Sequence, residues 1–189
     1  MTPLMLTPPL AEPVTLLEAK AWLKIDSSDE DELLQTLVSA ARLMIEAASG
    51  QMLMDQTWRI VLDVWPVNGR LRLPVSPLQN VVEVRVFASN GQPQMLPLSA
   101  LSFEAGAEPP VLVVSGAVPT PGRIHQGIEI DVLIGHGPLP ADVPAPLRQA
   151  VLRLVAYWFE NRGDVAGGET AALPRDIMAL IAPYRRVRL

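Results

Sequence analysis

Two stretches of the chain, far apart in the sequence, carry hydrophobic residues at helical spacing. In residues 28–50 these form one stripe along about five turns, and the stripe consists of Leu33, Leu34, Leu37, Val38, Ala41, Met44, Ile45 and Ala48. Gly50 provides a C-terminal stop for this helix. In residues 147–162 the stripe consists of Leu147, Ala150, Val151, Leu154, Val155, Trp158 and Phe159. Because each stripe needs an apolar face about 100° wide to be covered, we expect the two helices to pack on each other.

Capping and proline signals predict two shorter helices and the start of the long one. A Thr-x-x-Glu capping box opens a predicted helix over residues 15–24. Ser27 or Ser28 is expected to cap the next helix, whose acidic first turn suits the positive end of the helix dipole. Pro174 suits the first turn of a last helix over residues 175–182.

The middle of the chain alternates between apolar and polar residues with a period of two, which is typical of strands. One face of the first strand is expected to hold Trp58, Ile60, Leu62 and Val64, and the other face Thr57, Arg59, Val61 and Asp63. In the next strand Val82, Val84 and Val86 alternate with Glu83, Arg85 and Phe87. The dipeptide Asn90-Gly91 predicts a hairpin turn, and two further strands are predicted at 111–114 and 128–134. These patterns indicate a small, mostly antiparallel β domain over residues 57–135.

The 19 prolines divide the chain in the same way. Four lie in residues 1–13, none in 14–65, thirteen in 66–146 and none in 147–173. Since a proline in a helix interior costs about 3 kcal/mol, the two proline-free windows are where the long helices are expected. The proline-rich middle is expected to hold strands, turns and loops.

The predicted fold class is therefore α+β, an α-helical bundle formed by the N- and C-terminal segments with a small, mostly antiparallel β domain inserted between them. The expected parts are an extended N-terminal arm (1–13), a discontinuous helical domain (14–56 and 145–183), the β domain (57–135), a proline-rich linker (136–144) and a C-terminal tail (184–189).

Composition argues against catalysis. The 189 residues include no cysteine and two histidines, which excludes disulfides, thiolate metal sites, cysteine nucleophiles and a multi-histidine metal centre. No phosphate-binding glycine motif and no nucleophile with a base is found. His136 is interpreted as a turn residue rather than a general base, and the acidic run 29–32 lacks the spacing of a cation-binding loop. We therefore predict no enzyme, no catalytic residue, no metal and no cofactor.

The chain is expected to be a soluble protein without a membrane segment. Its start has no basic region and is interrupted by prolines, unlike a secretory signal. No run approaches the roughly 18 consecutive apolar residues that a membrane-spanning helix needs.

Charge is unevenly distributed along the chain. Residues 147–189 contain seven arginines, no lysine and four acidic residues, a net charge of +3, so residues 1–146 carry −8 of the total of −5. The segment 184–189, Tyr-Arg-Arg-Val-Arg-Leu, has the composition of a docking peptide. A frayed terminus that aids solubility is an equally good interpretation.

Nearly the whole chain resembles the head–tail connector, or adaptor, proteins of long-tailed bacteriophages and of gene transfer agents. The resemblance rests on short motifs whose order and spacing are more specific than any one of them. They are residues 13–26, the acidic residues 29–32, residues 40–42, Glu46, residues 56–58, residues 73–78, Val81, Val84, residues 143–150, residues 157–162, Leu173, Pro174, Leu180 and residues 183–185.

The resemblance implies a structural protein of the neck of a phage or gene-transfer-agent particle, made in the bacterial cytoplasm. It implies a homo-oligomeric ring beneath the portal protein, dodecameric to match the portal, with a stopper or tail-completion protein below. DNA would pass through the ring during packaging and ejection without specific binding, as suits an acidic protein. By analogy the C-terminal segment reaches the portal, which makes the candidate portal contacts Tyr184, Arg185, Arg186, Arg188 and Leu189.

The acidic residues before the long helix are candidates for a second surface, facing either the channel or a neighbouring subunit. They are Asp26, Asp29, Glu30, Asp31 and Glu32. In the neighbour version they meet Arg148 or Arg153 of the next copy. Two other functions stay open, a small ligand-binding or hydrolytic α+β protein and a nucleic-acid-binding module that uses the arginine-rich end. The acidic balance of residues 1–146 argues against the second of these.

Overall fold

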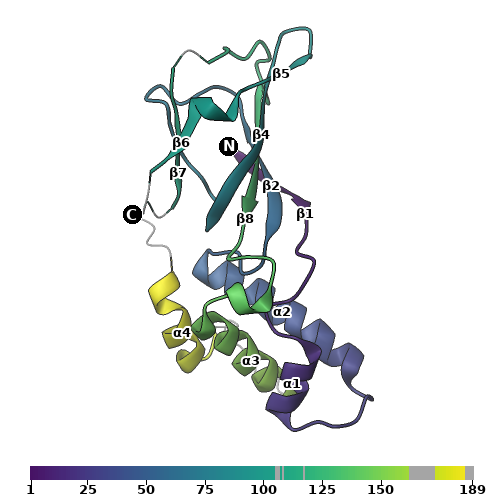
Figure 1. Cartoon of the computed structure of the whole chain (residues 1–189). Helices are drawn as coiled ribbons and strands as arrows, with labels where there is room; N and C mark the ends of the chain where they lie inside the picture. Colours follow the sequence, from purple (N-terminus) through teal and green to yellow (C-terminus); the bar gives the residue numbers. More distant parts are fainter. Residues whose placement is uncertain (105–106, 108, 117, 162–172, 186–189) are drawn as a thin grey trace, which may run out of the picture. The chain divides into compact units, whose positions relative to one another are not determined.

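The computed structural model describes residues 1–104, 107, 109–116, 118–161 and 173–185. The chain divides into two compact units, each made of two separate stretches of sequence. The β unit comprises Met1–Leu10 and Asp55–His136, and the helical unit comprises Ala11–Met54 and Gly137–Leu189 (Figure 1). The chain therefore passes between the units three times. The predicted α+β class is confirmed.

The helices of the helical unit bury one shared apolar core. They are α1 (Leu16–Leu23), α2 (Asp31–Ser49), α3 (Ala145–Glu160) and α4 (Arg175–Ile181), with short 3-10 turns at Pro140–Asp142 and Ala182–Tyr184. Helix α2 packs on α3, while α1 and α4 each contact both. The fully buried core residues include Leu34 and Ile45 of α2, Leu147 and Leu154 of α3, and Ile177 and Ile181 of α4. The two apolar stripes that are far apart in the sequence thus pack on each other.

The ends of α1 and α2 follow the capping rules with one exception. The predicted capping box is present at the start of α1, where the Thr15 N–H donates to the Glu18 carboxylate at 2.8 Å. Helix α2 ends at Gly50, which has the left-handed φ of 77° that favours glycine. The prediction that Ser27 or Ser28 caps α2 is wrong. Both serines lie in the preceding turn, where the Ser28 carbonyl accepts from the Asp31 N–H at 3.2 Å.

The described residues of the β unit form two antiparallel sheets. The strands are β1 (Thr2–Thr7), β2 (Gln56–Leu62), β3 (Arg70–Arg72), β4 (Leu78–Phe87), β5 (Pro93–Met95), β6 (Leu101–Phe103), β7 (Val111–Val114) and β8 (Ile128–Ile134). The larger sheet has the order β1-β2-β8-β4-β5 and the smaller one β3-β7-β6. In the larger sheet Ile130 lies opposite both Ile60 and Val84, and all three are fully buried. The strand at the centre of this core is therefore contributed late in the sequence.

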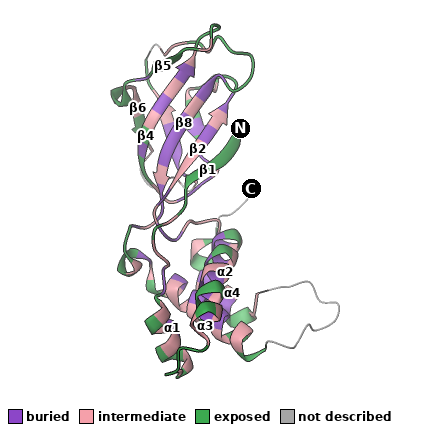
Figure 2. Ribbon diagram, turned by 90° about the vertical axis from the view of Figure 1, so that its right-hand side faces the viewer, coloured by how far each residue is buried: buried purple, intermediate pink, exposed green. Residues whose placement is uncertain are grey.

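Three sequence predictions for the β unit need correction. Val64 lies beyond the end of β2 and is exposed. A bulge in β4 shifts the alternation, so Val82 does not share the buried face of Val84 and Val86: Val81 is 8% exposed and Val82 is 52% exposed. Residues 1–13 were expected to be an extended arm, but Thr2–Thr7 form β1, which pairs with β2 and is exposed along its length (Figure 2).

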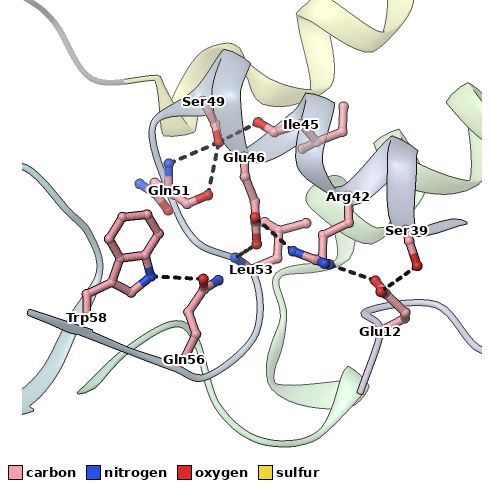
Figure 3. Close-up of polar contacts among 10 residues, drawn as sticks. All are labelled: Glu12, Ser39, Arg42, Ile45, Glu46, Ser49, Gln51, Leu53, Gln56 and Trp58. Carbon is pink, nitrogen blue, oxygen red and sulfur yellow. Dashed lines mark hydrogen bonds and ion pairs between the residues drawn. The ribbon is translucent and has the colours of Figure 1, made fainter. Parts of the chain in front are cut away.

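A polar network interrupts the apolar face of α2. Arg42 and Glu46 are only 8% and 4% exposed. Arg42 lies between two carboxylates, donating from Nε to Glu12 at 2.7 Å and from Nη1 to Glu46 at 3.0 Å (Figure 3). Ser39 also donates to Glu12, at 2.8 Å, and the Leu53 N–H donates to Glu46 at 2.9 Å.

This network holds both ends of the segment 11–54 against α2. Glu12 comes just after the first passage between the units, and Leu53 comes just before the second. Burial raises the pKa of Glu46, although the Leu53 N–H and the Arg42 guanidinium act in the opposite direction. Arg42 therefore offsets the cost of placing the carboxylates of Glu12 and Glu46 close together in a largely buried site.

Replacing Arg42 tests the network. Arg42→Ala should lower the free energy of unfolding by about 3 kcal/mol near neutral pH, because Glu46 would keep a buried charge without the neighbouring cation. A carboxyl whose pKa is raised on folding stabilises the folded state fully below its unfolded pKa, and this contribution is lost as the pH rises through the folded pKa. The loss caused by Arg42→Ala should thus be larger at about pH 7 than at about pH 5.

Urea unfolding at the two pH values, followed by helical circular dichroism, measures both effects. Arg42→Lys keeps the positive charge and serves as the control, with a smaller expected loss. An equal loss for Arg42→Ala at both pH values would contradict the role assigned to Glu46.

Candidate functional site

The predicted acidic residues lie in the turn between α1 and α2 and in the first turn of α2. Asp26, Asp29 and Glu32 are exposed and have no ion-pair partner among the residues that the structure describes. Asp31 is different, because Lys20 Nζ contacts its carboxylate at 2.6 Å. Glu30 is the N-cap residue of α2. Part of the predicted acidic surface is thus available for a partner, and part of it stabilises the turn.

Arg148 is engaged within its own chain. Its Nε donates to the Pro13 carbonyl oxygen at 2.9 Å, and its Nη2 pairs with the carboxylate of Glu18. Burial raises the pKa of Glu18, but hydrogen bonds from Thr15 and Arg148 outweigh this effect, and the net shift is downward. Arg148 therefore joins α3 to the start of α1 through its Nε and Nη2 donors.

Arg153 pairs with a residue of α4. Its Nη1 contacts the Asp176 carboxylate at 2.7 Å, and the hydrogen bond from Arg153 lowers the pKa of Asp176. Both side chains are about half exposed, so this pair is weak and leaves Arg153 accessible. The adjacent Arg175 is exposed and pairs with no acidic residue in the described part of the chain.

The predicted C-terminal docking residues fall into two groups. Tyr184 is half-buried against the helical core, and Arg185 is exposed directly after it. Arg186, Arg188 and Leu189 lie outside the described residues. The structure thus fixes where the tail leaves the helical unit.

Helix α1 has apolar side chains that the described residues of the helical unit leave exposed. Leu17 is 78% exposed and Trp22 is 46% exposed. A cavity of about 400 Å³ beside the helix is lined by Leu16, Leu17, Lys20, Ala21, Ile25 and Asp26. We call these six residues the α1 surface. A second cavity of about 290 Å³ is lined by residues that include Leu16, Val38 and Pro140.

The polar face of the larger sheet carries a ladder of charges across β2, β8 and β4. Arg59 donates to both carboxylate oxygens of Asp131, at 2.8 and 2.9 Å, and Arg85 donates to Asp131 at 2.7 Å. The hydrogen bond with Asp131 raises the pKa of Arg59. Both arginines also lie within 3.3 Å of Glu129. These guanidinium groups are therefore neutralised within the sheet and are not directed at an external anion.

The described residues contain little that could support chemistry. They include no group of three or more His, Cys, Asp or Glu side chains arranged to hold a metal ion. Nor does that part of the chain contain a helix with the length and hydrophobicity needed to cross a membrane. The side chain of His125 is 86% exposed, 4.0 Å from Asp63, and lies in no cavity described above. The candidate functional features of the described residues are thus exposed apolar and charged surfaces rather than a reactive cleft.

Comparison with known proteins finds a family that is similar to the first part of the chain. Residues 13–92 match the model of the family "Phage gp6-like head-tail connector protein". This stretch includes α1, α2 and the first strands that follow them. No curated protein matches the chain.

Solved structures extend the similarity to the whole chain. A chain in the neck of an empty gene transfer agent particle with C6 symmetry is 25% identical, with a TM-score of 0.82 and coverage of 100% of this chain and 97% of that one. A chain in the virion of a native gene transfer agent particle is 26% identical, with the same coverage and a TM-score of 0.81. A third, from the neck of a native particle with C12 symmetry, is also 26% identical over the same coverage, with a TM-score of 0.74.

These matches confirm the resemblance to connector proteins of phages and gene transfer agents, and with it the expectation of a structural rather than enzymatic protein. Residues 13–92 are thus similar to phage gp6-like head–tail connector proteins, and the whole chain has the fold of proteins from gene transfer agent particles.

Proposed function

We propose that this protein is a head–tail connector that forms a ring in the neck of a phage-like particle, beneath the portal, and extends the DNA channel toward the tail. The observation that carries this proposal is the match of the entire chain to a protein chain in the neck of a gene transfer agent particle. The C6 and C12 symmetries of the matched necks support a ring of identical copies, with twelve as the expected number. The partners are the portal on the head side and a stopper or tail-completion protein on the tail side.

A particle producer that lacks this chain tests the proposal directly. Because no other component would join portal to tail, we expect DNA-filled heads and free tails instead of complete particles, counted by electron microscopy. Expression of the chain from a second copy of its gene should restore complete particles. Normal tailed particles in the absence of the chain would overturn the proposal.

The channel role requires that DNA slides past the protein without being held. The net charge of −5 repels phosphates. In addition, Arg59 and Arg85 are neutralised by Asp131, and Arg148 is occupied by Glu18. Several arginines that could have neutralised phosphates are thus paired with carboxylates of their own unit.

A direct binding measurement separates this role from that of a nucleic-acid-binding module. The purified protein should show no measurable affinity for duplex DNA at about 0.15 M salt. Fluorescence anisotropy with a labelled duplex over a range of salt concentrations provides the test. Tight binding that weakens steeply as salt rises would instead favour the nucleic-acid-binding function.

We also propose that the C-terminal segment from Tyr184 to Leu189 contacts the portal. What supports this is the exposed position of Arg185 at the point where the chain leaves the helical core. A short segment with arginines and an aromatic residue is well suited to a docking role. Arg186, Arg188 and Leu189 complete the segment.

Truncation tests the tail. Because Tyr184 packs on the core, the cleanest variant removes residues 185–189 and keeps the tyrosine. This variant should fold with unchanged helical circular dichroism but should fail to join portal-bearing, tailless heads in a sedimentation assay. A matched control replaces Arg72, an exposed residue of the β unit, with glutamate and should bind as the intact protein does. Normal attachment of the truncated protein would refute the portal contact.

A further inference from the structure

The helical unit has two chemically different flanks. Helix α3 lies between α1 and α4 (Figure 1), and both outer helices pack on the α2–α3 pair. The α1 surface forms part of one flank, and α4 forms the other. A ring with cyclic symmetry requires this kind of arrangement, because each copy must present one surface to the preceding copy and a different one to the next.

The exposed face of α1 carries more apolar residues than is usual for a helix that faces water. Leu17 and Ala21, which are four residues apart on α1, line one cavity together with Ile25, which follows the end of the helix. Leu17 is 78% exposed, and Ala19 alone among the residues of α1 is fully buried. An amphipathic surface helix would place polar residues at these positions. The composition of α1 thus indicates that another apolar surface covers it.

The two flanks have opposite charge. Beside the α1 surface, Asp26 and Asp29 are exposed and carry no ion-pair partner among the described residues. On the α4 flank Arg175 is exposed without such a partner, and Arg153 is held only by the exposed Asp176. The exposed residues Ala179 and Ala182 lie farther along the same flank and leave room for a leucine side chain to approach.

We propose that the α1 surface of each copy binds the α4 flank of the next copy, with Leu17 in the apolar contact and Asp29 facing Arg175. This rests on the proposed ring and names the surfaces that close it. The occupant is a second copy because the complementary surface, basic and lined with small residues, is present on this chain itself. Arg148, one of the two arginines expected from the sequence to meet the neighbour's acidic residues, is excluded by its bonds to Pro13 and Glu18.

The apolar part of the contact is tested with two leucines. Leu17→Asp places a carboxylate where the contact would bury it, so it should lower the fraction of heads that carry tails by at least about tenfold. The substitution should not harm folding, since Leu17 is exposed in the first turn of α1, where an acidic residue is favourable. Leu43→Asp is the matched control, because Leu43 is a 57% exposed leucine of α2 outside both flanks.

Both variants are expressed in a producer that lacks the natural chain, and tailed particles are counted by electron microscopy. The expected result is loss with Leu17→Asp and normal tails with Leu43→Asp, both proteins having the thermal unfolding of the unmodified chain. Normal tails with Leu17→Asp, or equal loss with both variants, would overturn the proposal.

The ionic part is tested by exchanging charges. Asp29→Arg and Arg175→Glu should each reduce the fraction of tailed particles by roughly threefold to tenfold, because each places like charges opposite one another. The two substitutions in one chain restore opposite charges across every contact in the ring and should recover most of the tailed particles. Glu160→Arg, which changes an exposed acidic residue at the end of α3, controls for the change of net charge. A double variant no better than the worse single variant would refute the pairing.

The outcomes also separate this inference from the proposed function. If particles acquire tails without the chain, the connector function fails. If the chain is required but Leu17→Asp and Asp29→Arg leave tail attachment unchanged, the connector function stands and the α1–α4 contact is wrong.

Discussion

The contact between α2 and α3 is the interaction on which the helical unit depends. These two helices are separated in the sequence by the whole second part of the β unit, so the unit exists only because their apolar stripes meet. Leu34 and Ile45 on one helix and Leu147 and Leu154 on the other are completely buried. Burying a side chain of this size contributes about 1.5 to 3 kcal/mol relative to leaving it exposed. The loss of one such side chain would therefore remove a large share of the net stability of a small domain.

Elements with a strong periodic pattern could be predicted from the sequence, and elements fixed by local irregularity could not. The stripe of α2 and the alternation in β8 led to helices and strands close to those observed, because burial of one face dictates both patterns. The bulge that buries Val81 and exposes Val82 cannot be seen in the pattern of apolar and polar residues, since both residues are valines. Strand β1 was missed because all of its side chains are exposed and it is held mainly by its backbone pairing with β2.

The charged residues of the candidate surfaces could be predicted from the sequence, but their ion-pair partners could not. The acidic turn and the arginine-rich C-terminal region are visible as letters, yet which charges are satisfied depends on residues distant in sequence. Arg148 pairs with Glu18, which lies 130 residues away in the sequence, whereas Arg175 has no such partner among the residues that the structure describes. Arg42 and Glu46 are likewise four residues apart on an apolar face, a spacing that permits an ion pair. That Glu12 completes this network could be learned only from the fold.

Because each unit is made of two separate stretches of sequence, a fragment of this protein keeps a complete core only if it contains both stretches. The stretch recognised by the family model, 13–92, contains α1 and α2 but neither α3 nor α4, and it contains β2 and β4 but not the β8 that joins them. A polypeptide cut at those limits would lack half of each core. Ile45, Ile60 and Val84 would then be exposed to water, because the elements that cover them would be missing. The segment that the family model matches is thus not a segment that can fold by itself. Truncated variants should therefore keep both stretches of each unit.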